Sequence, residues 1–175
     1  PRSTLFPYTT LFRSRCNDLV CHPSGVIFFT DFGGKNTKGL FARAADGTVS
    51  QVDAEYAAAN GVALSPDSKT LYVADYGGAT LKAYDVDATG AATNPRTFAS
   101  FRGETGRGRA DGLKVSADGK VLTTGPGGIW VILPDGTRHS RLPIPGGASN
   151  LAIGGADGKT VFITSGTKVL SVKLK

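Results

Sequence analysis

The sequence lacks several features that large classes of protein require. It has no apolar run long enough to span a membrane, and apolar residues at helical spacing are scarce. Its two cysteines, Cys16 and Cys21, are five positions apart, which is too far along one extended strand for an unstrained disulfide. We therefore expect no membrane partner, no long helix and no disulfide, and we expect both cysteines to be small buried side chains.

Residues 1–14 lack the pattern of the rest of the chain. They read PRSTLFPYTTLFRS and closely resemble the translated reading frame of a common sequencing adapter. We interpret them as an artefact joined to a truncated gene and exclude them from the fold; a natural strand or linker is the alternative. On this interpretation the native N-terminus and any signal peptide are missing, so a cytoplasmic location and a periplasmic or secreted one both stay open.

Positive charge is in excess but is scattered. The formal net charge is +6, and it falls to +4 without residues 1–14, whose only charged residues are Arg2 and Arg13. The remaining basic residues are not interleaved with aromatic ones, so we expect no nucleic-acid partner. The loop 102–109 holds three arginines but lacks the Gly-Lys-Ser/Thr of a P-loop. It is interpreted either as a solvated loop or as one in which Arg107 or Arg109 recognises an anionic or sugar-acid substrate.

A short pattern occurs four times within residues 15–175. Each copy opens with Asn or Asp, continues as a short alternating strand, turns at a segment containing Gly, Pro or Asp, and continues as a second strand. The openers are Asn17, Asn60, Asp111 and Asn150, at steps of 43, 51 and 39 residues. Repeats of this length that each contain a hairpin predict the blades of an all-β propeller.

The pattern predicts four blades, at about 15–53, 54–101, 102–142 and 143–175. The last of them shows only three clear strands. Closed propellers usually complete one blade with a strand from the other end of the chain, which removes the exposed edge. We therefore expect these blades to be part of a larger ring, with a small closed ring of four blades as the alternative.

The four openers are candidate ligands for a metal ion. The innermost strand of each propeller blade lines the central channel, so Asn17, Asn60, Asp111 and Asn150 should converge on the axis. Three carboxamides and one carboxylate form an oxygen-only set, which suits Ca²⁺ first and then Mg²⁺ or Mn²⁺. Zn²⁺ is less favoured because no His or Cys is an opener. Alternatively, the openers only cap the turns that enter each strand.

Other polar and aromatic residues are assigned structural roles. Asp31 and Asp75 stand at equivalent ends of second strands, where we predict hydrogen bonds to the backbone of the following turns. Trp130 lies in an alternating apolar strand and is predicted to be in the core. His22 and His139 are predicted to be surface or turn residues.

Several segments, taken in order, resemble the gluconolactonase/regucalcin (senescence marker protein-like) family. They are RCNDLV with HPSG and FTD, NGVALSPD with LYVAD, DGLKV, TGPGGIW and SNLAIGG. The resemblance covers residues 15–175. It implies a six-bladed β-propeller, of which this chain would hold the last four blades.

The resemblance also implies roles for individual residues. In the family a Glu of the first blade, an Asn opening the fourth and an Asp opening the fifth hold the metal, and Asn60 and Asp111 match the last two. Asn17 matches an Asn that contacts the metal or its substrate, and Arg15 an Arg that touches the substrate in some members. Asn150 is expected to contact the substrate as well. The Glu has no counterpart here, so we expect the chain by itself to be impaired.

The expected function is divalent-metal-dependent hydrolysis of a sugar lactone or a similar small lactone. A Ca²⁺-type ion would polarise the lactone carbonyl. Asp111 is the expected catalytic residue, as general base or water positioner, although a bound metal would lower its pKa and leave it mainly a ligand. Two alternatives stay open: an organophosphate-hydrolysing propeller of the diisopropyl-fluorophosphatase type, and a calcium- or ligand-binding propeller without turnover. No pattern indicates an oligomeric state.

Overall fold

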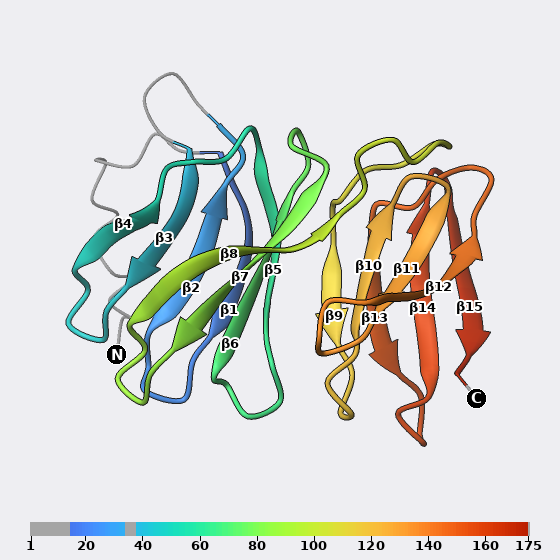
Figure 1. Ribbon diagram of the computed structural model, residues 1–175. Helices are drawn as coiled ribbons and strands as arrows, with labels where there is room; N and C mark the ends of the chain where they lie inside the picture. The colour runs from blue at the N-terminus through green and yellow to red at the C-terminus, as the bar shows by residue number, and fades with distance from the viewer. Residues whose placement is uncertain (1–14, 34–37, 175) are drawn as a thin grey trace, which may run out of the picture.

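The computed structural model describes residues 15–33 and 38–174; residues 1–14, interpreted above as an adapter artefact, lie outside it. The described residues form fifteen strands and no helix, so none of them belongs to a helix that could cross a membrane. The strands build four antiparallel sheets that follow one another along the chain (Figure 1). This arrangement confirms the predicted all-β propeller with four blades.

The first two blades, named A and B, have four strands each. Blade A contains β1 (Cys16–Cys21), β2 (Ile27–Asp31), β3 (Gly39–Arg43) and β4 (Val49–Asp53). Blade B contains β5 (Ala59–Leu64), β6 (Thr70–Asp75), β7 (Thr80–Val86) and β8 (Ala92–Ser100). In each blade the first strand is innermost and the strands pair in chain order.

Blades C and D complete the described chain. Blade C contains β9 (Leu113–Val115), β10 (Val121–Gly125), β11 (Gly128–Ile132) and β12 (Arg138–Pro143). Blade D contains β13 (Asn150–Gly154), β14 (Thr160–Ser165) and β15 (Lys168–Lys173). Among the described strands, β15 pairs only with β14, which agrees with the three strands expected from the sequence.

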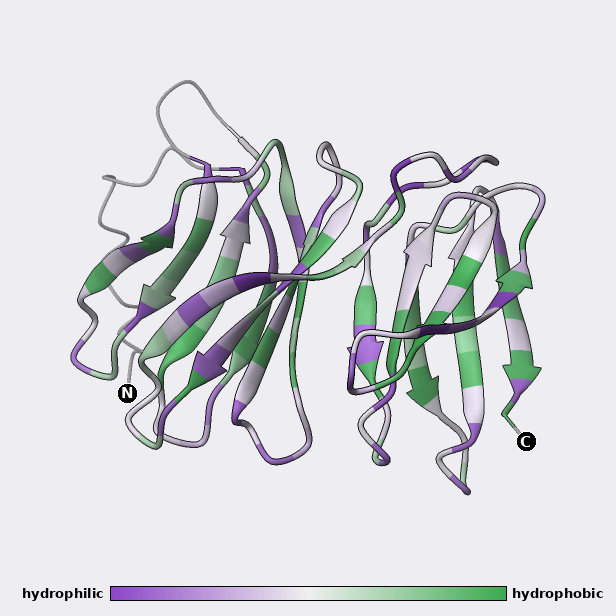
Figure 2. Cartoon of the chain, viewed as in Figure 1, coloured by the Kyte–Doolittle hydropathy of each residue, from purple (hydrophilic) through white to green (hydrophobic). Residues whose placement is uncertain are grey.

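The hydrophobic core lies between the blades, one layer for each pair of neighbours. Phe28 and Tyr84 belong to the layer between blades A and B, Leu81 and Trp130 to the layer between B and C, and Ile163 to the layer between C and D. Trp130 is 8% exposed, which confirms its predicted core position. Figure 2 shows hydrophilic stretches on β8 and β12, the outermost strands of their blades. Burial of apolar area between sheets therefore orders the blades around the axis.

A polar network also ties blade A to blade B. The carboxylate of Asp53 accepts hydrogen bonds from Lys82 Nζ (2.8 Å) and from the hydroxyl of Tyr84 (2.6 Å). Burial raises the pKa of Asp53, but these two bonds, the N–H of Glu55 and the positive charge of Lys82 together leave the pKa lowered. Because Asp53 ends β4 and its partners lie on β7, the network helps to set the angle between the two blades.

One sequence-based expectation about blade A was wrong. Cys16 and Cys21 lie on β1 without a disulfide, as expected, but both are exposed rather than buried. Side chains alternate along a strand: Val20 packs into the layer shared with blade B, so Leu19 and Cys21 point to the opposite face. Leu19 is 60% exposed there.

Candidate functional site

A β-bulge at the start of the first strand positions the openers. In blade A the pairing shifts between Cys16 and Leu19, and in blade B it shifts between Ala59 and Val62. Each bulge adds one residue opposite the second strand, which redirects the side chains at that point. In blade C the regular pairing begins at Leu113, and Asp111 stands two residues before it. The same spacing separates Asn17 from Leu19 in blade A and Asn60 from Val62 in blade B.

Threonines of the second strands hold these openers. The backbone N–H of Asp111 donates to Thr124 Oγ1 (2.9 Å), and the Thr124 hydroxyl donates to the carbonyl of Arg109 (2.8 Å). Thr30 has the same place in blade A, where its hydroxyl contacts the carbonyl of Asn60 in the next blade. The openers therefore belong to a hydrogen-bonded frame that crosses from blade to blade.

Four of the predicted site residues line one pocket of about 410 Å³: Arg15, Asn17, Asn60 and Asp111. The pocket lies at the axial end of the blades where the first strands begin. Asn60 is buried and Asp111 is half-buried. The structure thus brings together the three residues predicted to bind metal and one predicted to bind substrate. Their roles as metal and substrate ligands stay predictions.

Asn150 is not among the residues that line this pocket. Blade D has no bulge at its first strand: Asn150 pairs with Thr164 and Leu151 with Ile163. Two residues before Leu151 stands Ser149, so Ser149 and not Asn150 has the place equivalent to Asp111. The Oδ1 of Asn150 instead accepts the N–H of Leu151 (2.8 Å). A substrate contact of Asn150 stays a prediction without a place in this pocket.

Asp18 adds negative charge close to the pocket, beyond that of the openers. Burial raises the pKa of Asp111, a hydrogen bond with Asn60 acts in the opposite direction, and the negative charge of Asp18 raises it further. Asp18 follows Asn17 directly, and its two carboxylate oxygens accept the N–H groups of Leu19 (2.9 Å) and Val62 (3.2 Å). The sequence analysis overlooked Asp18, although its place beside an opener was a usable signal.

These donors fit a hard divalent cation. The carboxylate of Asp111 and the side-chain oxygens of two asparagines line one half-buried pocket. Asp18 does not line it, but its charge acts on Asp111, and a cation would relieve that unfavourable interaction. Within residues 15–33 and 38–174, no group of three or more His, Cys, Asp and Glu side chains gathers around a metal position. A cation in this pocket would therefore need the amide oxygens as well.

Two aromatic side chains, Phe32 and Tyr76, form one wall of the pocket. Their rings meet edge to face, 5.5 Å between centres, and the guanidinium carbon of Arg15 lies 6.0 Å from the Phe32 ring centre. The sequence analysis missed both, although each directly follows an acidic residue that ends a second strand. Packing between blades A and B brings them together.

The acidic residues before them have the structural role that the sequence predicted. Asp31 Oδ1 accepts the N–H of Gly33 (3.0 Å) and Asp75 Oδ1 accepts the N–H of Gly78 (3.0 Å), each in the turn after its strand. The histidines differ from each other. His139 is exposed, whereas His22 lies in a turn but is buried, with Nδ1 2.8 Å from Ser24 Oγ.

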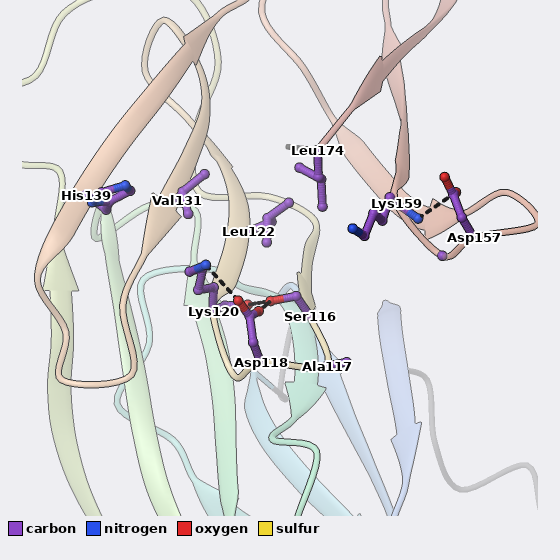
Figure 3. A pocket seen from close by; sticks show the side chains of 11 residues that line it. Ser116, Ala117, Asp118, Lys120, Leu122, Val131, His139, Asp157, Lys159 and Leu174 are labelled. Carbon is purple, nitrogen blue, oxygen red and sulfur yellow. Dashed lines mark hydrogen bonds and ion pairs between the residues drawn. The ribbon is translucent and has the colours of Figure 1, made fainter.

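A larger cavity of about 570 Å³ lies between blades C and D, at the opposite end of the blades (Figure 3). Leu122, Val131 and Leu174 point into it. On its rim Lys120 pairs with Asp118, 2.6 Å between Nζ and Oδ2. None of the predicted site residues lines it, and the Lys120–Asp118 pair on its rim is already formed.

The blades and the oxygen-lined axial pocket define a β-propeller with a candidate ligand site at one end of its central channel. The family model described as the SMP-30/gluconolactonase/LRE-like region matches residues 3–167. The chain therefore belongs to this family, and the resemblance stated from the sequence is confirmed.

Relatives with known names agree with this assignment. The gluconolactonase of Zymomonas mobilis is 30% identical over 178 aligned residues, covering 91% of this chain and 50% of that protein. A gluconolactonase structure from Xanthomonas campestris is 27% identical with a TM-score of 0.77, covering 91% of this chain and 57% of that one. Regucalcin from Agrobacterium tumefaciens, named a calcium-binding protein, is 27% identical with a TM-score of 0.74, covering 87% and 54%. The chain thus spans about half the length of these relatives.

Proposed function

We propose that the chain carries the main part of the active site of a divalent-metal-dependent lactonase that hydrolyses a sugar lactone or a similar small lactone. One observation carries the proposal: Asn17, Asn60 and Asp111, from three successive blades, line one pocket together with Arg15. The two relatives named gluconolactonase support the reaction class. The regucalcin relative supports Ca²⁺ as the first metal to test, with Mg²⁺, Mn²⁺ and Zn²⁺ as alternatives.

In this proposal the oxygens of Asn17, Asn60 and Asp111 hold the cation. When bound, the cation would act as a Lewis acid on the lactone carbonyl and stabilise the oxyanion that forms there. Asp111 positions the water for attack on that carbonyl. Arg15 donates hydrogen bonds to oxygens of the substrate, and the rings of Phe32 and Tyr76 offer an apolar wall to the sugar ring.

We propose further that the chain by itself is a weak enzyme. Ca²⁺ takes about six to eight oxygen ligands. Only three of the openers, Asn17, Asn60 and Asp111, line the pocket and can supply them. The Glu that completes the family's metal site has no counterpart in this sequence. Cation affinity and turnover should therefore be lower for this chain than for a relative of full length.

The proposal predicts that Ca²⁺ or Mn²⁺ raises the unfolding midpoint of the chain, because a ligand that binds only the folded state stabilises it. Asp111→Asn should abolish this rise and lower lactone hydrolysis by about 10²-fold or more, the usual range for loss of a general base or water positioner. The measurements are a thermal melt with and without the cation and proton release from glucono-1,5-lactone.

Asp135→Asn serves as the matched control. Asp135 is exposed in the turn between β11 and β12, where Oδ1 accepts the N–H of Thr137 (2.8 Å), so its substitution should leave the cation effect unchanged. If neither cation raised the midpoint and Asp111→Asn hydrolysed lactone at the rate of the parent chain, the lactonase proposal would be abandoned.

A calcium-binding propeller without turnover is the second candidate, favoured by the name of the regucalcin relative. It makes a different prediction. Ca²⁺ would raise the midpoint and Asp111→Asn would remove the rise, but no lactone would be hydrolysed.

A further inference from the structure

Two arginines stand at equivalent sequence positions before the first strands of blades A and C. Arg15 stands four residues before Leu19, and Arg109 stands four residues before Leu113; both leucines begin the regular pairing with the second strand. In blade B this place belongs to Ala58. Arg15 lines the axial pocket, and Arg109 is not among the residues that line it. By its count before the first strand, Arg109 stands one blade beyond Ala58.

The backbone of Arg109 is firmly held there. Its carbonyl accepts the Thr124 hydroxyl that also receives the N–H of Asp111, so both residues are attached to one side chain. The preceding Gly108 lies so close to blade C that an added Cβ would be 2.6 Å from the carbonyl oxygen of Gly125. Figure 1 shows this loop, between β8 and β9, above the ends of blades C and D.

The guanidinium of Arg109 has no role within the described part of the chain. It is exposed, and no hydrogen bond or ion pair to a residue of 15–33 or 38–174 engages it. The one acid of the loop, Glu104, is held elsewhere: its carboxylate pairs with Arg138 (2.6 Å) and Arg141 (3.9 Å). Arg109 therefore keeps its five N–H donors for a partner outside this chain.

From this placement we infer that Arg109 is a specificity residue, which together with Arg15 recognises an anionic group on the substrate. This inference rests on the proposed lactonase function. The planar guanidinium fork matches a carboxylate or a phosphate with two parallel hydrogen bonds. Two such forks beside Ala58 would hold the anion at the pocket mouth, away from Asp111 and Asp18, whose negative charges would repel it.

The substrate class that follows is a lactone carrying a carboxylate or a phosphate, in preference to a neutral lactone. Glucaro-1,4-lactone carries the carboxylate and 6-phosphoglucono-1,5-lactone the phosphate, while glucono-1,5-lactone is the neutral reference. The ratio of kcat/KM for a charged lactone to that for the neutral one measures the preference. Comparing the two charged lactones decides which anionic group is preferred.

Arg109→Gln tests the inference. Hydrogen bonds to charged groups contribute about 1.5–3 kcal/mol, so the ratio for the preferred charged lactone should fall about tenfold or more, mainly through KM. Arg96→Gln is the matched control: Arg96 is exposed on the outer strand β8 and pairs with Asp85 (2.7 Å). It removes the same charge far from the axis and should keep the ratio. An unchanged ratio in Arg109→Gln would overturn the inference.

A binding measurement separates this inference from the proposed function. Titration calorimetry with glucarate, 6-phosphogluconate and gluconate needs no turnover. Suppose that no lactone is hydrolysed but Arg109→Gln still weakens the binding of glucarate or 6-phosphogluconate more than the binding of gluconate. Anion recognition would then stand and the lactonase proposal would fail. If Arg109→Gln bound all three as the parent chain does, anion recognition by Arg109 would be refuted whether or not lactone is hydrolysed.

Discussion

At the scale of single residues, the turn between the first and second strands shows how one side chain can store strain. Gly25, Gly119 and Gly158 occupy this turn in three blades, with φ of 90°, 82° and 64°. In blade B the position belongs to Ser68, with φ of 59°. All four donate an N–H to the carbonyl three residues earlier, so the turn demands the left-handed conformation whatever residue is present.

Ser68→Gly is therefore expected to stabilise the chain. The left-handed region costs a residue with a Cβ roughly 1–2 kcal/mol, which glycine avoids. The greater conformational freedom of glycine in the unfolded state offsets about 0.5–1 kcal/mol of this stabilisation. We expect the free energy of unfolding, measured by urea denaturation, to rise by up to about 1 kcal/mol. Gly119→Ser should lower the free energy of unfolding, because it places a Cβ in the left-handed conformation. Its Cβ would meet only Pro134 Cγ, at 3.4 Å, so a steric clash adds nothing to this cost. A loss of stability in Ser68→Gly would contradict this account.

At the scale of strands, one position in each second strand faces the next blade. In chain order it holds Phe28, Tyr72, Leu122 and Phe162, paired with Ala42, Ala83, Val131 and Ser171 of the third strand. The first three are 0%, 4% and 3% exposed because the following blade covers them. Phe162, on the outward face of blade D, is 41% exposed.

This difference predicts unequal costs for the same kind of truncation. Leu122→Ala should lower the free energy of unfolding by about 2–5 kcal/mol, since it removes buried apolar contacts in the layer between blades C and D. Phe162→Ala should cost clearly less, although it removes more atoms, because much of that ring already contacts solvent. Urea denaturation of both variants provides the comparison. Equal losses would mean that the outward face of blade D is covered in solution.

At the scale of the whole molecule, the blades approach most closely at the axis. The N–H of Gly61 donates to the carbonyl of Asp111 (3.0 Å), and the N–H of Gly112 donates to the carbonyl of Ser149 (3.0 Å). A Cβ added to Gly61 would lie 2.3 Å from the carbonyl oxygen of Asp111, which is backbone and cannot rotate away. The spacing of blades B and C, and with it the site, depends on this glycine.

Gly61→Ala should therefore disturb stability and the metal site together. We expect a loss of about 1–3 kcal/mol in the free energy of unfolding, the usual cost of overpacking, and a smaller rise of the midpoint with Ca²⁺. Gly154→Ala in β13 is the control, because its Cβ would only reach ordinary contact with Phe162, at 3.5 Å. If Gly61→Ala melted and bound Ca²⁺ as the parent chain does, the close approach would have no part in forming the site.

The success and failure of the sequence analysis follow from the range of the interactions involved. Asn17, Asn60 and Asp111 were found because the hairpin that follows each of them is a local structure with its own turn residues. Ser149 was missed because the neighbouring Asn150 has the residue type of the other openers, although the count before the strand points to Ser149. Phe32 and Tyr76 were missed because they meet only when two blades pack.

The sequence by itself determined the all-β class, the four blades, the family and three of the four openers, because alternation and turn chemistry act over a few residues. Only the tertiary structure decided which side chains share the pocket and which face of β1 exposes its cysteines. Those relations depend on bulges and on the distance between sheets, which hydrogen bonds and packing between residues far apart in the chain establish. The carboxylate of Asp111 becomes part of a candidate site through neighbours that stand 51 and 94 positions before it in the sequence.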